Sequence, residues 1–472
     1  MKKFIVAKFG GSNLKNHHDY TRLARIVKAY DQHLVIVVSA FHGLTNKPLS
    51  NLEKAVTAPS EAADFIQHIH SAQLRLIHEN IKSVHLIQEA TTEMDLRIAE
   101  LTAVLEQINA AGNVSDTLHD LALSYGERFS SLVTSKVLTD KGFDVEEVLP
   151  EGLGLVTDGN FGFATVDFKQ SASMVKNRLA ENKIYVVPGF YGISPHGQVN
   201  LFGRGGSDYT ASAIARCIGA VSLDVWKDVD GFMTADPGIV SGVSRIEKLS
   251  YNEAAELAYF GARILHPDTV SPLVKVKIPL RILNIDAFSR NIVPSTIING
   301  YHEVHPGVIK SITYNDDFGI LRIKGAGVGA RSGILAEITN RLEYEKVNIK
   351  SVITSQTAIN ILLSKKDLAR AHRGINRTSI SNIADITTIS EISVIAVVGE
   401  GIMERAGVMA RIIGAVGARH INLQTIVMGA SPVSAYLVVQ LTDRDAALQT
   451  IHSSQFPDQS RMCIYFYKIH KR

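Results

Sequence analysis

Five residues in the C-terminal part of this 472-residue chain recur at a constant spacing, and this repeat constrains the fold most strongly. Arg331, Gly333, Ala336, Ile338 and Asn348 reappear 74 positions later as Arg405, Gly407, Ala410, Ile412 and Asn422. Each copy predicts a strand, a glycine turn, an amphipathic helix, two strands and a helix, as in a ferredoxin-like βαββαβ unit. We therefore expect two such units, over residues 315–390 and 392–472.

The preceding part of the chain, residues 1–300, alternates short apolar runs with helical patterns. The runs are rich in β-branched residues, which is typical of strands buried on both faces of a mostly parallel sheet. They lie at residues 4–9, 34–39, 184–188, 222–226 and 280–284. Apolar residues at helical spacing predict a helical insertion at about residues 50–115. The expected fold class is α/β, with a mostly parallel sheet sandwiched by helices and followed by the two smaller units.

Composition excludes several classes of protein. The chain is 46% hydrophobic and 20% charged, and its 49 basic and 46 acidic residues give a net charge of +3. This balance argues against an extended nucleic-acid surface. Two cysteines, Cys217 and Cys463, are too few for a disulfide framework or a thiolate metal site, so no protein-bound metal is expected. No apolar run approaches the ~18 residues of a membrane span, and a cytoplasmic protein is the expectation.

Two glycine-rich segments that contain a cation predict a site for a phosphate donor and a small anion. The first, Lys8-Phe9-Gly10-Gly11-Ser12, follows a predicted strand. Glycine N–H groups can approach a phosphate closely, and Lys8 balances its charge. An ordinary glycine turn is the alternative for this segment alone. The segment lacks the Gly-x4-Gly-Lys-Ser/Thr pattern, so a P-loop ATPase is not indicated.

The second segment, residues 203–210 (Gly-Arg-Gly-Gly-Ser-Asp-Tyr-Thr), leads into an amphipathic helix. Ser207 or Asp208 lies at the helix N-terminus, where backbone N–H groups attract an anion. Both residues are also ordinary helix caps. Arg204 between two glycines favours the functional interpretation, because a guanidinium on a flexible loop suits bidentate recognition of a carboxylate.

Two further segments place charged groups where a ligand could meet them. Residues 124–129, Ser-Tyr-Gly-Glu-Arg-Phe, put Glu127 beside Arg128 on a predicted helix. The pair is either a surface ion pair or includes a carboxylate that holds a substrate ammonium group. Residues 226–237 end a strand and enter a turn rich in Asp, Gly and Pro. Ligands of parallel sheets gather at such ends, although any loop has this composition.

Together these segments resemble aspartate kinase (aspartokinase) of the amino acid kinase superfamily, in its single-function form with two C-terminal ACT domains. The resemblance spans essentially the whole chain and rests on six segments in the family's order. They are residues 8–12, 39–46, 126–129, 203–210, 226–237 and 260–267. It implies ATP-dependent phosphorylation of the L-aspartate side chain to 4-phospho-L-aspartate. This step leads to lysine, threonine and methionine, and feedback through the ACT domains is implied as well.

The resemblance also implies roles for individual residues. The implied catalytic residues are Lys8, Asp208 and Arg263. The implied aspartate site is Ser39, Thr45, Glu127, Arg204, Gly205, Gly206 and Ser207. The implied ATP site is Lys8, Phe9, Gly10, Gly11, Ser12, Lys227, Asp228, Met233, Asp236, Gly238, Arg263 and Ile264, with Mg2+ held mainly by the phosphates. The implied effector site is Val328, Arg331, Ile334, Leu335 and Lys350. A homodimer through the ACT domains, or a larger assembly, is implied, without a nucleic-acid or membrane partner.

The sequence departs from the family pattern around the implied nucleotide site. Lys227 stands where the family has threonine, and Arg263 where it has lysine. Met233 and Gly238 replace a tyrosine and an arginine. These departures bear on nucleotide affinity, and they keep two alternatives open. One is a kinase of a related acidic amino acid of the glutamate type, and the other is a degenerate, amino-acid-binding regulatory subunit.

The first repeat also departs from lysine-sensitive members of the family. Alignment of residues 347–356 with their effector-binding strand puts Lys350 at an aspartate and Gln356 at a glutamate. A carboxylate that attracts a cationic ligand is thus replaced by a cation that repels it. We expect free lysine to inhibit this protein weakly or not at all. The alternative is that Lys350 points to solvent and the effector binds elsewhere in the repeats.

Overall fold

The computed structural model describes residues 4–41, 52, 54–262, 264–377, 380 and 383–456. The chain forms two compact units. Unit 1 consists of Met1–Phe232, Arg245–Ala258 and Arg263–His302. Unit 2 consists of Met233–Ser244, Tyr259–Ala262 and Glu303–Arg472, so two short segments of the first part of the chain belong to the second unit.

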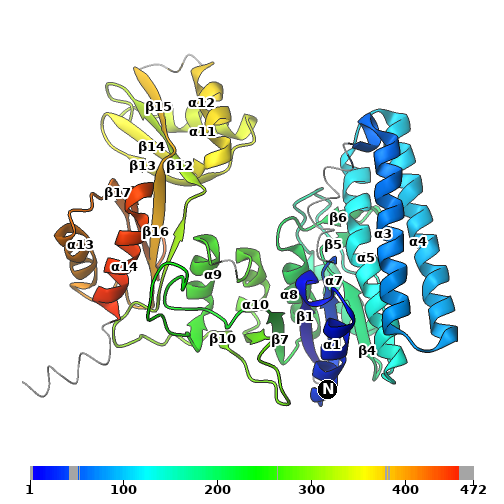
Figure 1. The fold of residues 1–472 in the computed structure, drawn as a ribbon. Coiled ribbons are helices and arrows are strands. Elements are labelled where there is room, and N and C mark those ends of the chain that lie inside the picture. The colour runs from blue at the N-terminus through cyan, green and yellow to red at the C-terminus, as the bar shows by residue number, and fades with distance from the viewer. Residues whose placement is uncertain are drawn as a thin grey trace, which may run out of the picture. The chain divides into compact units, whose positions relative to one another are not determined.

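Unit 1 is built around an eight-stranded sheet with the order β3-β4-β2-β1-β7-β9-β10-β8 (Figure 1). Its strands are β1 (Phe4–Phe9), β2 (His33–Val38), β3 (Val145–Glu147), β4 (Ile184–Pro188), β7 (Ser222–Lys227), β8 (Lys248–Ser250), β9 (Leu280–Asn284) and β10 (Thr296–Asn299). All neighbouring strands are parallel except β9 and β10. The expected α/β class and mostly parallel sheet are confirmed.

The helices of unit 1 include three long ones that run side by side in Figure 1. These are α3 (Pro59–Asn80), α4 (Val84–Ala111) and α5 (Asp116–Asp140). Helices α3 and α4 occupy the expected insertion, and their apolar faces share a core with the sheet strands. Further helices of this unit are α1 (His17–Ala29), α6 (Pro150–Leu153), α7 (Phe168–Arg178), α8 (Gly206–Ile218), α9 (Tyr251–Tyr259) and α10 (Ser271–Val274). A hairpin of β5 (Tyr191–Ile193) and β6 (Val199–Leu201) completes the unit.

Unit 2 contains two four-stranded antiparallel sheets, in agreement with the repeat. The first repeat comprises β12 (Phe318–Lys324), α11 (Ile334–Tyr344), β13 (Ile349–Thr354), β14 (Ala358–Ser364), α12 (Leu368–Asn376) and β15 (Asp385–Ile389). The second comprises β16 (Ile392–Val398), α13 (Val408–Ala418), β17 (Thr425–Val427), β18 (Ser434–Gln440) and α14 (Arg444–Gln455). Strands β12 and β16 start 74 positions apart, as do helices α11 and α13.

The two repeats differ in the origin of one strand. The sheet of the second repeat has the order β11-β16-β18-β17, and β11 (Ser311–Asn315) precedes the first repeat in sequence. Ser311 pairs with Val398 and Asn315 with Val394 in an antiparallel ladder. The expected boundaries, 315–390 and 392–472, therefore leave out most of a strand of the second repeat. The reason is that β11 satisfies its backbone hydrogen bonds with a strand about 80 residues away, which local sequence patterns do not reveal.

Unit 2 also includes two segments that the sequence places among the strands and helices of unit 1. Within unit 2, the backbone N–H of Ile312 donates to the Thr234 carbonyl, and Thr234 Oγ1 lies 3.0 Å from His452 Nε2. Ala235 and Val240 contribute to the core of the second repeat. None of the helices that the structure describes combines the length and apolar character needed to cross a bilayer.

Candidate active site

The C-terminal ends of four parallel strands in unit 1 meet at one edge of the sheet. Phe9 of β1 is in register with Val38 of β2 and Trp226 of β7, and Val38 is in register with Pro188 of β4. The loops that follow these strands therefore start side by side. They carry Gly10–Ser12, Ser39–Phe41, Gly189–Phe190 and Asp228–Gly231. Ligands of parallel α/β sheets bind at this edge.

Strand alternation brings two lysines to the same face of the sheet. Ile5, Ala7 and Phe9 of β1 contribute to the core shared with the long helices, and so does Trp226 of β7. Lys8 and Lys227 therefore point to the opposite face. Helix α8 packs on β1 and β7 and presents its first-turn residue Asp208 to both lysines. A lysine within a buried, apolar strand is unusual unless it is paired, which makes Lys8 the strongest functional signal in this strand.

Asp208 is the shared partner of the two ammonium groups. Its Oδ1 lies 2.6 Å from Lys8 Nζ, and its Oδ2 lies 3.4 Å from Lys227 Nζ. Burial favours the neutral carboxyl, but attraction by the two lysines outweighs it and lowers the pKa of Asp208 to about 2. Burial also lowers the pKa of Lys8, and the nearby charge of Lys227 acts in the same direction. Two cations and one carboxylate leave a positive charge at this site.

The neighbouring residue on α8 points to a different group. Ser207 Oγ lies 3.4 Å from Glu127 Oε1, and both side chains are buried. Burial raises the pKa of Glu127 to about 8, although the Ala40 backbone, Ser207 and Lys8 act in the opposite direction. Consecutive residues at the start of α8 therefore contact a cationic cluster on one side and a buried carboxyl group on the other.

Glycines allow the elements around these groups to approach closely. A Cβ at Gly126 would lie 2.9 Å from Ala40 Cβ, so this glycine lets α5 bring Glu127 to the loop after β2. Gly205 has φ of 76°, and its Cβ would lie 2.3 Å from His266 Cβ. A Cβ at Gly206 would lie 2.8 Å from the Phe190 ring. Arg204 is exposed on the turn between Gly203 and Gly205.

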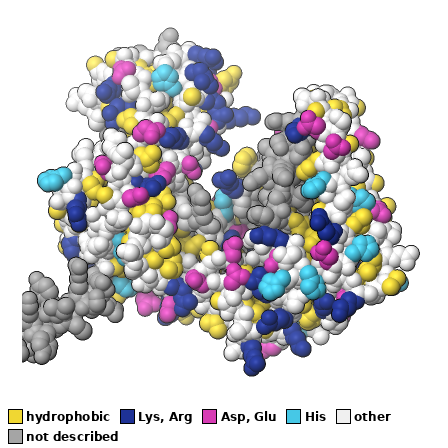
Figure 2. Space-filling model, in the orientation of Figure 1, with side chains coloured by type: hydrophobic (Ala, Val, Ile, Leu, Met, Phe, Trp, Pro, Cys, Tyr) yellow, Lys and Arg dark blue, Asp and Glu magenta, His cyan; other side chains and the backbone are white. Residues whose placement is uncertain are grey.

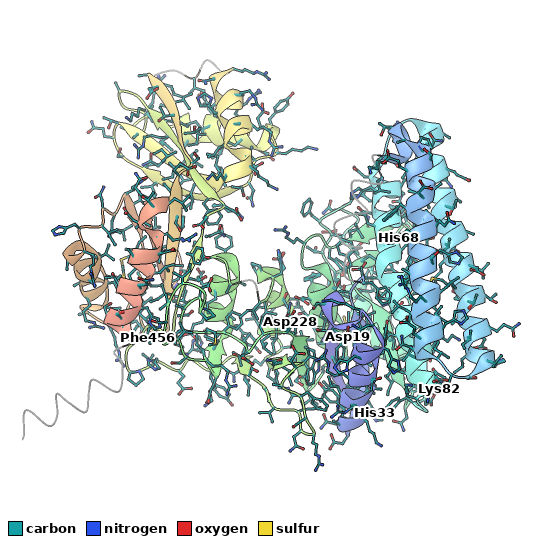
Figure 3. All side chains as sticks on the ribbon, in the orientation of Figure 1. Asp19, His33, His68, Lys82, Asp228 and Phe456 are labelled. Atoms are coloured by element: carbon teal, nitrogen blue, oxygen red, sulfur yellow. The ribbon has the colours of Figure 1, made fainter. Side chains whose placement is uncertain are left out.

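The structure brings together only part of the implied nucleotide site. Gly10, Gly11 and Ser12 lie in the loop beside Lys8, and Asn13 Nδ2 donates to the Trp226 carbonyl at 3.1 Å. Asp228, labelled in Figure 3, is exposed beyond the end of β7, and Ile264 is half-buried. Met233, Asp236 and Gly238 belong to unit 2. Thr45 and Arg263 lie outside the described residues.

The described residues offer no preformed metal site, because they contain no cluster of three or more His, Cys, Asp or Glu side chains suited to a metal ion. Asp208 is engaged by two lysines. Because both oxygens of Asp208 face lysines, this carboxylate does not fit as a ligand for Mg2+.

Three residues that sequence reasoning missed help to position the site. Phe190 has φ of 78°, a left-handed conformation that is strained for a non-glycine residue, and its N–H donates to Thr210 Oγ1. Asn13 ties the glycine loop to β7. Asp120 is fully buried and accepts hydrogen bonds from the backbone N–H groups of Gly162 and Leu201. Of these three residues, only Asp120 gave a signal in the sequence, as a charged residue in a helix with a buried face.

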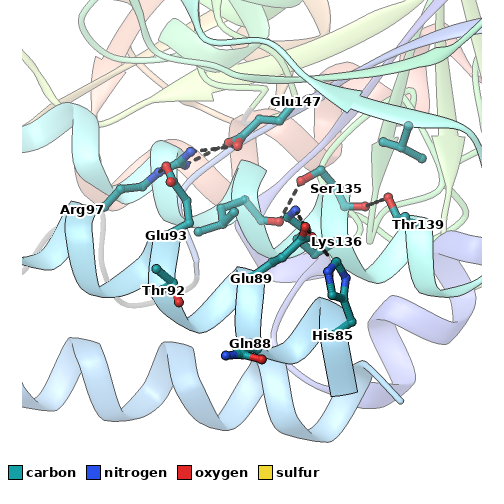
Figure 4. A pocket seen from close by; sticks show the side chains of 12 residues that line it. His85, Gln88, Glu89, Thr92, Glu93, Arg97, Ser135, Lys136, Thr139 and Glu147 are labelled. Atoms are coloured by element: carbon teal, nitrogen blue, oxygen red, sulfur yellow. Dashed lines mark hydrogen bonds and ion pairs between the residues drawn. The ribbon is translucent and has the colours of Figure 1, made fainter. Parts of the chain in front are cut away.

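A second group of buried charges in unit 1 lines a polar groove between α4, α5 and β3 (Figure 4). The Arg97 guanidinium forms a bidentate pair with Glu147, at 2.9 and 2.8 Å, and its Nε donates to Glu93 at 3.0 Å. It also donates to the Arg128 carbonyl. Lys136 pairs with Glu89 at 2.9 Å in the same groove. Because all three nitrogens of Arg97 have partners within the protein, we interpret this cluster as structural.

The implied effector residues lie in the first repeat of unit 2. Val328 and Ile334 belong to its core, whereas Arg331 and Leu335 are exposed. Lys350 lies on β13, which is an edge strand, and its Nζ lies 4.9 Å from the centroid of the Tyr259 ring. The ammonium of this half-buried side chain therefore contacts an aromatic ring, and the alternative that the effector binds elsewhere in the repeats stays open. On the face shown in Figure 2, basic and acidic side chains both occur on each unit.

Comparisons with known proteins agree with this geometry. The model of the amino acid kinase family matches residues 3–284, and an ACT domain model matches residues 395–455. Lysine-sensitive aspartokinase 3 of Escherichia coli is 26% identical over 470 residues, which cover 97% of this chain and 100% of the relative. A bifunctional aspartokinase/homoserine dehydrogenase of Haemophilus influenzae is 27% identical over 468 residues, and the chain spans 56% of its length.

A solved structure shares the fold over nearly the whole chain. The crystal structure of E. coli aspartokinase III in complex with aspartate and ADP has a TM-score of 0.80 and 25% sequence identity. The similarity covers 96% of this chain and 100% of that one. The amino acid kinase model alone matches more than half of the sequence. With its C-terminal ACT domain, this protein belongs to the amino acid kinase family.

Proposed function

We propose that this protein is an aspartate kinase, which transfers the γ-phosphoryl group of ATP to the side-chain carboxylate of L-aspartate. The observation that carries the proposal is the start of α8. There, consecutive side chains contact a cationic cluster suited to phosphate, through Asp208, and a buried carboxyl suited to an ammonium group, through Ser207. The aspartokinases among its relatives support aspartate as the acceptor.

The acceptor carboxylate needs no general base, because its ordinary pKa of ~3.9 leaves it ionised at neutral pH. The main barrier is its repulsion from the phosphates. Lys8 offsets the charge on the transferred group, and the family resemblance assigns the same role to Arg263, while the N–H groups of the glycine loop orient the phosphates. Mg2+, when bound with the nucleotide, offsets further phosphate charge. Glu127 holds the α-ammonium group of aspartate and Arg204 its α-carboxylate.

An assay that couples ADP release to NADH oxidation and traps the acyl phosphate with hydroxylamine tests the proposal. We expect ADP and aspartyl hydroxamate in equal amounts, dependent on both ATP and L-aspartate. Glutamyl hydroxamate in place of the aspartyl product would support the glutamate-type kinase. Amino-acid binding by calorimetry without any ADP release would support the regulatory subunit.

We also propose that unit 2 mediates homodimerisation and amino-acid control, and that free lysine is a poor effector. The support is the half-buried ammonium of Lys350, which lies over the Tyr259 ring and repels a second cation. Light scattering tests the homodimer and should give twice the mass of the chain.

To test the effector, L-lysine and L-threonine are titrated into the aspartate kinase assay. Strong inhibition by lysine below millimolar concentration would overturn the idea, whereas a lysine response gained in Lys350→Asp would support it.

A further inference from the structure

Lys227 occupies a position that the family resemblance assigns to the nucleotide, yet its ammonium group turns to a different partner. It is the last residue of β7, and its Nζ lies 3.4 Å from Asp208 Oδ2. Lys8 Nζ pairs with the other oxygen of the same carboxylate. The Lys227 side chain is 21% exposed and those of Lys8 and Asp208 are 7% and 8% exposed, so all three charged groups are largely shielded from solvent.

The charges of this group do not balance. An ammonium has three donors, and among the described residues Lys8 and Lys227 share the single carboxylate of Asp208. Glu127 adds little negative charge near neutral pH, because burial raises its pKa to about 8. Threonine, the family's residue at position 227, would leave Lys8 and Asp208 as a neutral pair. An excess cation at a largely desolvated site is unfavourable without a counter-charge, so the excess at Lys227 favours an anionic ligand.

We propose that Lys227 is a second catalytic lysine, which contacts the transferred phosphoryl group together with Lys8 and does not read the base or ribose of the nucleotide. Asp208 is the positioning residue that orients both lysines. This inference rests on the proposed function. A carboxylate oxygen of the acceptor forms a bond to the γ-phosphorus, and the bond from that phosphorus to the bridging oxygen breaks. The electron pair stays on ADP, and no proton moves. The two ammonium groups offset the charge of the group in transfer.

The variants Lys227→Met and Lys227→Thr test the role, with Lys227→Arg as the conservative change. The matched control is Lys136→Met, which also removes a lysine from an ion pair in unit 1 but lies in the groove of Figure 4. We expect Lys227→Met and Lys227→Thr to lower kcat by about 10²-fold, the scale of removing one preorganised charge donor. ADP affinity and Tm should change little, and Lys227→Arg should recover part of kcat.

Two outcomes of the kinetic and thermal measurements would overturn the proposal. If kcat is retained while the KM for ATP rises, Lys227 reads the nucleotide. If only Tm falls, Lys227 merely ties β7 to α8. Competitive acylation of Lys8, followed by mass spectrometry across pH, gives a readout that does not need activity. The Lys227→Met variant lacks the neighbouring positive charge, so the pKa of Lys8 that this reaction reports should rise. If the pKa of Lys8 stays unchanged in Lys227→Met, the two lysines do not share Asp208. This measurement does not need aspartate kinase activity, so failure of this inference is distinguishable from failure of the proposed function.

Discussion

Two buried charge clusters in unit 1 differ in how their charges and donors are satisfied. In the Lys8–Asp208–Lys227 cluster, two cations share one carboxylate. In the Arg97 cluster, one guanidinium has two carboxylates and a backbone carbonyl as partners. Each cluster contains a group with a shifted pKa, which is lowered for Lys8 and Asp208 in the first and raised for Arg97 in the second. The difference shows that perturbed ionisation alone does not mark an active site. An excess charge at the C-terminal edge of a parallel sheet is the stronger indication, because ligands of such sheets bind at that edge.

Removing a cation from the unbalanced cluster should have the largest effect. Lys8→Met should lower kcat by at least ~10²-fold, because Lys8 meets charge that is strongest in the transition state. The fold should survive, since Asp208 keeps Lys227 as a partner. Steady-state kinetics and thermal unfolding measure the two effects, with Lys136→Met as the control. A near-normal kcat in Lys8→Met would remove Lys8 from the active site.

An exposed cation near the same cluster should affect binding instead of turnover. Arg204→Ala should weaken aspartate binding by about 2–3 kcal/mol, because a charge-assisted bidentate contact is lost. The KM for ATP should change much less. The control is Arg75→Ala, which also removes an exposed arginine, from helix α3. Equal changes in both KM values would mean that Arg204 does not recognise aspartate.

Breaking the Arg97 cluster, in which every guanidinium nitrogen has a partner within the protein, should affect stability and leave catalysis intact. Arg97→Met should lower the free energy of unfolding by about 2 kcal/mol, because Glu147 loses its bidentate partner while only partly exposed. Arg178→Met breaks the adjacent but more exposed pair with Glu146 and should cost less than ~1 kcal/mol. Urea titration of both variants gives the values. A drop in kcat larger than the loss of folded protein would place Arg97 in the catalytic site after all.

The carboxyl group beside the unbalanced cluster should make aspartate binding depend on pH. Glu127, with a pKa of about 8, is mostly protonated in the free protein at pH 7, so binding of an ammonium group must release its proton. Aspartate affinity should therefore rise by about tenfold per pH unit below pH 8 and level off above it. Calorimetry in buffers of different ionisation enthalpy measures the proton release. Affinity independent of pH between 6 and 8 would contradict this role, and Glu127→Gln should abolish the dependence.

Local sequence patterns predicted the strands that form the site edge. Residues 4–9 and 184–188 match β1 and β4, because continuous β-branched runs have few other stable environments than a buried parallel sheet. Lys8 was identifiable as the charged residue in such a run. The positions of Asn13 and Phe190 were not predictable, because their roles depend on contacts with Trp226 and Thr210, far away in sequence.

The sequence by itself determined the α/β class, the repeat with its spacing of 74 residues and the residue types of the site. These features follow from hydrophobic periodicity and glycine placement, which act over a few residues. Only the tertiary structure decided that β11 completes the second repeat and that Lys227 shares Asp208 with Lys8. It also decided that Arg97 pairs with Glu147. Strand partners and ion pairs form between residues distant in sequence, and packing selects them among many alternatives of similar local propensity.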